Sequence, residues 1–177
     1  VEGRGQILDL GAAAGTEGHV EISGGTLTLA EMRIGGRDTG TANSNAGGTG
    51  TVIQSGGTVN INDPSAPGVQ SLYLGDSDFT TGTATANGSY SISAGALNSG
   101  TATDDSIVVG TGSGSQGTFT QTGGDVLSTG FISIGRRGAT GSWTMSGGTL
   151  KANGATLGMY IGDGDTGSTG TGTFTQS

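Results

Sequence analysis

The residues best suited to chemistry are two pairs of aspartates that follow glycines. Asp76 and Asp78 lie in the stretch GDSD, and Asp163 and Asp165 lie in GDGD. Paired carboxylates on glycine-rich loops can bind calcium. The same place in other repeats reads GRRG and GTGSG, however, so the acids do not recur as they do in calcium-binding repeats. We therefore expect no cofactor and keep calcium as an alternative, which a melting temperature unmoved by a chelator would remove.

A simpler interpretation of these aspartates is that charges alternate between neighbouring repeats. This interpretation places Arg37 near the first pair, and Arg136 and Arg137 near the second pair. Exposed ion pairs of this kind contribute only on the order of 0–1 kcal/mol. The aspartates would then shape the surface and add little stability.

Catalytic groups are sparse in the sequence. His19 is the only histidine and Lys151 the only lysine. We expect His19 to be a solvated surface residue without an acidic or hydroxyl partner in a catalytic arrangement. Polysaccharide lyases and pectin hydrolases use β-helix folds, but they need carboxylates clustered on one face. Here the acids fall mostly between the apolar segments, so we expect no enzymatic activity and no catalytic residue.

Three short motifs recur in fixed order and would position these groups. The first resembles LDLG at 8–11, the second GTVIQSGG at 50–57, and the third TVNI at 58–61. Each alternates apolar and polar residues with a period of two, which is typical of a half-buried strand. Insertions occur between the first and second motifs and between the third and first, but never at the SGG junction. The pattern predicts a three-sided coil with two tolerant loops and one tight turn.

Stacked coils of this kind form an all-β, right-handed parallel β-solenoid. The shortest coil is 24 residues long, from Gly11 to Gly35. We expect residues 1–177 to form a single solenoid domain of about five and a half coils. The chain would be a segment of a longer protein, or a fibre subunit whose ends are completed by neighbours.

Alternation along the second motif predicts an aromatic stack in the core. Its inward side chains in successive coils include Tyr90, Phe119, Trp143 and Phe174. Neighbouring strands lie roughly 4.8 Å apart, so these rings would be in contact. Glutamines occupy another inward column of the same motif, at positions 54, 121 and 176. We expect each amide to bond backbone groups of its own SGG corner, because a buried amide without a partner costs about 1–3 kcal/mol.

The outward face of the second motif carries regularly spaced hydroxyl groups. We call this surface the hydroxyl face: Thr51, Ser89, Thr118, Thr120, Ser142, Thr144, Thr173 and Thr175. One interpretation is that threonine simply suits an exposed strand. A second is lateral packing against another fibre or a glycan, and a third is the ordering of water in ice binding.

The composition excludes several classes of protein. A formal net charge of −8 argues against a nucleic-acid partner. No apolar run approaches the length of a membrane span, so we expect no membrane insertion by this segment. The absence of cysteine excludes a disulfide scaffold.

The repeats GTFTQ, SGGTLTL and LYLG resemble the β-strand repeats of autotransporter passengers and large exported bacterial proteins. The resemblance extends from Ile7 to Ser177. It implies secretion, an extracellular or cell-surface location, and a role as a stalk, fibre or adhesin. The insertions at 36–49 and 62–71 depart from the tidiest repeats and could carry recognition.

Together these patterns predict a non-enzymatic structural solenoid that contributes to an extracellular filament, stalk or surface layer. The expected partner is the chain itself, associated head to tail or laterally, with extracellular glycans as a further possibility. The alternative function is an adhesin or binding module for a glycan, or less favourably ice. Such a module would use the hydroxyl face or the inserted loops.

Overall fold

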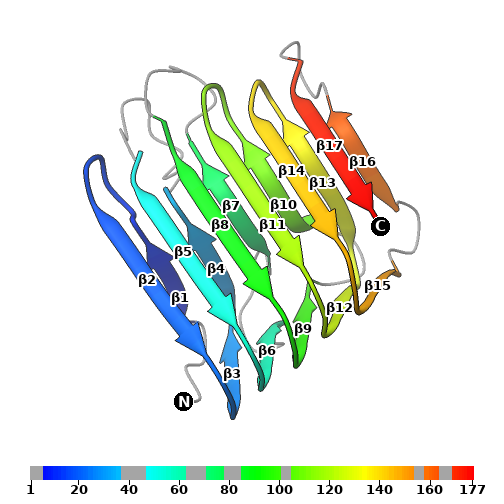
Figure 1. Ribbon diagram of the computed structural model, residues 1–177. Helices are drawn as coiled ribbons and strands as arrows, with labels where there is room; N and C mark the ends of the chain where they lie inside the picture. Colours follow the sequence, from blue (N-terminus) through cyan, green and yellow to red (C-terminus); the bar gives the residue numbers. More distant parts are fainter. Residues whose placement is uncertain are drawn as a thin grey trace.

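The computed structural model describes residues 6–36, 47–62, 71–77, 85–100, 105–153, 158–163 and 169–177. Within these ranges every regular element is a strand, and the strands stack in successive coils from the N-terminal to the C-terminal end (Figure 1). None of the described residues belongs to a helix able to span a bilayer.

Three parallel sheets form the sides of the coil. Sheet 1 contains β1 (Ile7–Leu10), β4 (Glu31–Ile34), β7 (Leu72–Asp76), β10 (Asp105–Thr111), β13 (Phe131–Arg136) and β16 (Met159–Asp163). Sheet 2 contains β2 (Glu17–Ile22), β5 (Thr49–Gln54), β8 (Asn87–Ile92), β11 (Gln116–Gln121), β14 (Thr140–Met145) and β17 (Thr171–Gln176). Sheet 3 contains β3 (Thr26–Leu29), β6 (Thr58–Ile61), β9 (Ala96–Ser99), β12 (Asp125–Ser128) and β15 (Thr149–Ala152). The predicted parallel β-solenoid is confirmed.

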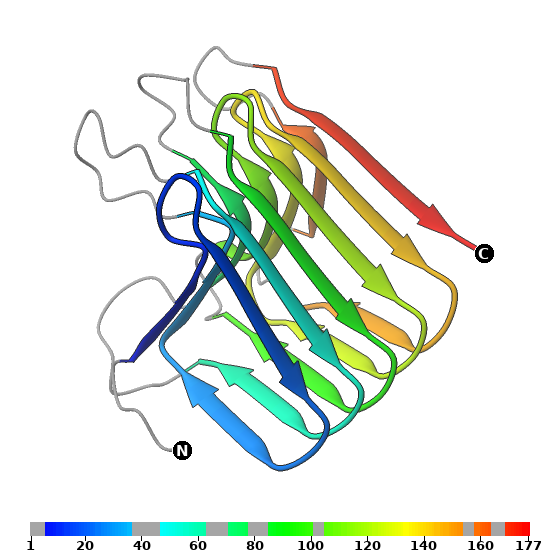
Figure 2. The same cartoon turned by 60° about the vertical axis from the view of Figure 1, so that its left-hand side comes forward.

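The tight turn lies between sheets 2 and 3, where Figure 2 shows the two sheets meeting. Three residues separate the strands at every such corner; Ser55, Gly56 and Gly57 join β5 to β6. The last of the three is always glycine with a positive φ, for example +75° at Gly25 and +72° at Gly57. Residues with a Cβ are strained in this conformation. The corner also bonds from coil to coil, since the Ser55 amide donates to the Ile22 carbonyl at 2.8 Å.

The core runs along the solenoid axis and contains the rings of sheet 2. Tyr90, Phe119 and Trp143 are each 0% exposed. Ring centroids are 5.3 Å apart between Tyr90 and Phe119, and 4.0 Å apart between Phe119 and Trp143. Phe174 continues the series at 6.4 Å from Trp143 and is partly buried. Each ring therefore packs against a ring of the neighbouring coil.

The inward glutamines bond the backbone at the tight turn. Gln54 Nε2 donates to the Gly57 carbonyl at 3.3 Å and to the Ala96 carbonyl of the next coil at 3.0 Å. Gln121 Nε2 donates to the carbonyls of Gly124 and Thr149, at 3.2 and 2.8 Å. The expectation of corner capping is confirmed for these two residues, while Gln176 is exposed. Each amide also ties two coils together.

Tyr90 also links two coils, and its burial predicts a loss of stability at high pH. Its hydroxyl donates to Gln54 Oε1 at 2.6 Å, and burial raises the pKa of Tyr90 above the ordinary value of 10.0. Above about pH 10 the unfolded chain loses this proton while the folded chain keeps it. We therefore expect the free energy of unfolding to fall by up to about 1.4 kcal/mol per pH unit. Urea unfolding on either side of that pH measures the fall.

The control for this experiment is Tyr90→Phe, which has no group to ionise at this position. Its stability at neutral pH should be lower by about 1–3 kcal/mol, because Gln54 Oε1 loses its partner in the core. Its stability should nevertheless change less between neutral and alkaline pH than that of the parent. Equal slopes for the two proteins would contradict the assignment to Tyr90.

Candidate functional site

The outward side of sheet 2 carries a regular array of polar side chains. Strand pairing aligns its residues in two rows that cross all six strands. The first row is His19, Thr51, Ser89, Thr118, Ser142 and Thr173; the second is Glu21, Ile53, Ser91, Thr120, Thr144 and Thr175. All twelve are exposed or half-buried. The eight residues of the hydroxyl face therefore lie on one surface, together with Ser91 and Ile53.

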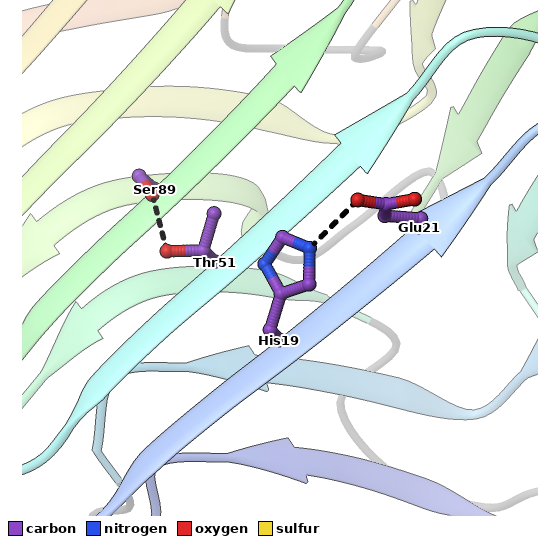
Figure 3. A network of polar contacts seen from close by, with 4 residues as sticks. All are labelled: His19, Glu21, Thr51 and Ser89. Atoms are coloured by element: carbon purple, nitrogen blue, oxygen red, sulfur yellow. Dashed lines mark hydrogen bonds and ion pairs between the residues drawn. The ribbon is translucent and has the colours of Figure 1, made fainter.

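Hydrogen bonds connect neighbouring hydroxyl groups along the first row. Ser89 Oγ donates to Thr51 Oγ1 at 3.2 Å (Figure 3). Ser142 Oγ lies 3.5 Å from Thr118 Oγ1. These contacts leave hydroxyl lone pairs directed to solvent, because a hydroxyl offers one donor and two acceptor sites.

His19 is exposed, as expected from the sequence, and it also has an acidic neighbour that was not expected. Its Nε2 lies 3.2 Å from Glu21 Oε1 on the same strand (Figure 3). The side chains of residues i and i+2 share one face of a strand, and this spacing was the available signal. Both side chains are more than half exposed. With solvent on both groups and no nucleophile in the contact, the pair is a surface ion pair of small energy.

A further outward row lies two residues before the first row on each strand of sheet 2. It contains two amide side chains that are not part of the predicted hydroxyl face. Asn87 and Gln116 are aligned on β8 and β11, one residue before the glycine that opens each motif. Between this row and the first row lies a depression of about 120 Å³. It is lined by Thr49, Gly50, Asn87, Gly88, Ser89, Gln116 and Thr118. The sequence signal for it is the polar residue that precedes each glycine.

Of the four candidate calcium ligands, the structure describes Asp76 and the backbone of Asp163. Asp76 is buried at the end of β7, and its Oδ2 lies 3.9 Å from Arg33 Nη1. Asp163 ends β16 with its backbone opposite Arg136, whereas Asp78 and Asp165 lie outside the described residues. Among the residues described there is no group of three His, Cys, Asp or Glu side chains able to hold a metal ion.

Arg33 forms a charged cluster on sheet 1 that the sequence did not predict. Its Nε donates to Glu31 Oε1 at 2.8 Å, and its guanidinium lies 5.7 Å from the Tyr73 ring centroid. Burial opposes the charge of Arg33, but Glu31 and Asp76 outweigh it, so the pKa is raised. Arg37, expected beside Asp76, lies outside the described residues. The cluster fixes two strands and contains no free nucleophile or base.

Comparisons of the chain with family models, curated proteins and solved structures found no match. The resemblance to exported β-helix repeats therefore stays a prediction. Proposals about function depend on the geometry of the solenoid and on the chemistry of its surfaces.

Proposed function

We propose that this chain is a non-enzymatic structural β-solenoid that contributes to an extracellular filament, stalk or surface layer. The observation that supports this role is the unbroken register of sheet 2. In sheet 2 the glycine of every strand is paired with the glycine of the next, from Gly18 of β2 to Gly172 of β17. Backbone hydrogen bonds therefore run along the axis without interruption.

Such continuity suits a mechanical element. Each coil contacts mainly its neighbours, and bending the axis would break hydrogen bonds in three sheets together. The Gln54 and Gln121 amides and the ring stack add further links between coils. A rod of this kind resists bending without needing a large globular core.

The proposed partner is the chain itself, associated head to tail or side to side. Parallel strands of uniform spacing pair readily with further strands of the same kind. The formal charge of −8 keeps the remaining surface soluble. The extracellular setting is proposed from the resemblance to exported repeats.

Electron microscopy of the native full-length protein tests this function. We expect filaments or rods, and fibre diffraction from oriented material should give a reflection near 4.8 Å along the long axis. Compact isometric particles, or a reflection of this spacing perpendicular to the long axis, would contradict the proposal.

A further inference from the structure

The depression on sheet 2 has the features of a ligand groove. Its floor is the backbone of Gly50 and Gly88, and its sides are the polar side chains of two rows. The same rows continue onto β14 and β17 as Thr140 with Ser142, and Thr171 with Thr173. The groove therefore has a direction, across the strands and along the solenoid axis.

The amides of the groove are free to bind a ligand. Asn87 and Gln116 lie opposite each other, and within the described residues neither side chain makes a hydrogen bond or an ion pair. Sheet 3 gives the contrasting case. There Asn98 Nδ2 donates to Asn60 Oδ1 of the aligned strand at 2.8 Å. Aligned amides on this solenoid can thus satisfy each other, and those in the groove do not.

The chemistry of the lining defines the class of ligand. Carboxamides and hydroxyls each donate and accept hydrogen bonds, and none of the described residues that line the groove is ionisable. Sugar hydroxyls have the same dual capacity. Anionic chains would be repelled by a protein of charge −8. We propose that this groove binds a neutral linear polysaccharide laid along the solenoid axis, with Asn87 and Gln116 as its principal hydrogen-bonding residues.

The proposal is tested by titrating the protein with neutral hexasaccharides of β-linked glucose, mannose and N-acetylglucosamine, and with a hexasaccharide of galacturonic acid. The readout is the NMR signals of the side-chain amides. At least one neutral sugar should shift the signals of Asn87 and Gln116 and leave those of Asn60 and Asn98 in place. The double variant Asn87→Ala, Gln116→Ala should weaken its binding about tenfold or more.

The matched control is Asn60→Ala, Asn98→Ala, which removes two amides from sheet 3 and should leave the affinity unchanged. Three outcomes would overturn the proposal: no shift with any neutral sugar, equal affinity in the groove variant and the parent, or preferential binding of the galacturonic acid chain. Filament formation is measured separately by microscopy of each variant. Failure of sugar binding would therefore leave the proposed structural function standing.

Discussion

Replacing Phe119 with alanine is expected to lower the free energy of unfolding by about 3–5 kcal/mol. Phe119 is the middle ring of the core, fully buried between Tyr90 and Trp143. Truncation removes its own burial and leaves a cavity between two coils. It also breaks two ring contacts, each worth about 0.5–1.5 kcal/mol beyond the buried area. Urea unfolding monitored by Trp143 fluorescence measures the loss.

Two further variants make this result interpretable. Thr118→Ala alters the adjacent outward residue and should change stability by no more than about 0.5 kcal/mol. Phe119→Leu keeps much of the volume and should cost less than alanine, which provides a measurement if the alanine variant does not fold. A loss below about 1 kcal/mol for Phe119→Ala would show that the rings do not hold the coils together.

The sequence predicted the solenoid because two local signals agreed. Period-two alternation identified the strands, and the constant three-residue spacing at the SGG corner separated the tight turn from the variable loops. The positive φ of Gly25 and Gly57 explains why the corner always has three residues. The tight turn needs this backbone conformation at its third residue, and glycine adopts it without strain. Gln54 was assigned to the corner for the same local reason.

Contacts between coils were predicted less well. The bond from Tyr90 to Gln54 joins residues 36 positions apart. Tyr90 is aligned with Val52, whereas Gln54 lies two residues further along β5, so the bond is diagonal and strand alignment alone does not predict it. Arg33, which the sequence did not single out, lies beside Asp76, whereas Arg37, the expected neighbour of Asp76, lies outside the described residues. That pairing depends on which face of β4 points outward and on how β4 and β7 align, with Arg33 opposite Tyr73.

The sequence does not predict the candidate groove, because the recurring second motif starts at its glycine. The strands of sheet 2 begin one residue earlier, so Asn87 and Gln116 lie on the outer face beside the hydroxyls. Their lack of partners cannot be read from sequence, since Asn60 and Asn98 occupy aligned positions and do bond each other. The repeated residues of the motifs specify the scaffold. A binding site depends instead on residues that differ from the repeat, such as Asn87 and Gln116, and the repeat pattern does not identify them.

Replacing Gly88 with alanine is expected to destabilise the protein by at least about 4 kcal/mol, a loss that few single substitutions reach. Gly88 lies where sheet 2 leaves the corner with sheet 1. A Cβ there would be 2.1 Å from the Ile34 carbonyl oxygen and 2.3 Å from the Gly75 nitrogen. Both atoms belong to the backbone of packed coils and cannot swing aside. Relief of the clash would separate β8 from β4 and β7, which breaks hydrogen bonds in two sheets.

Two glycines of the tight turn separate this steric effect from backbone strain. A Cβ on Gly24 would meet no atom within 4 Å and needs no positive φ, so Gly24→Ala should stay within about 0.5–1 kcal/mol of the parent. Gly25 is equally open but has φ +75°, so Gly25→Ala should cost about 1–2 kcal/mol. The urea midpoint should therefore be highest for Gly24→Ala, lower for Gly25→Ala and lowest for Gly88→Ala. If Gly88→Ala were as stable as Gly25→Ala, the coils would not pack backbone against backbone at this corner. The recurring glycine of the second motif would then need another explanation.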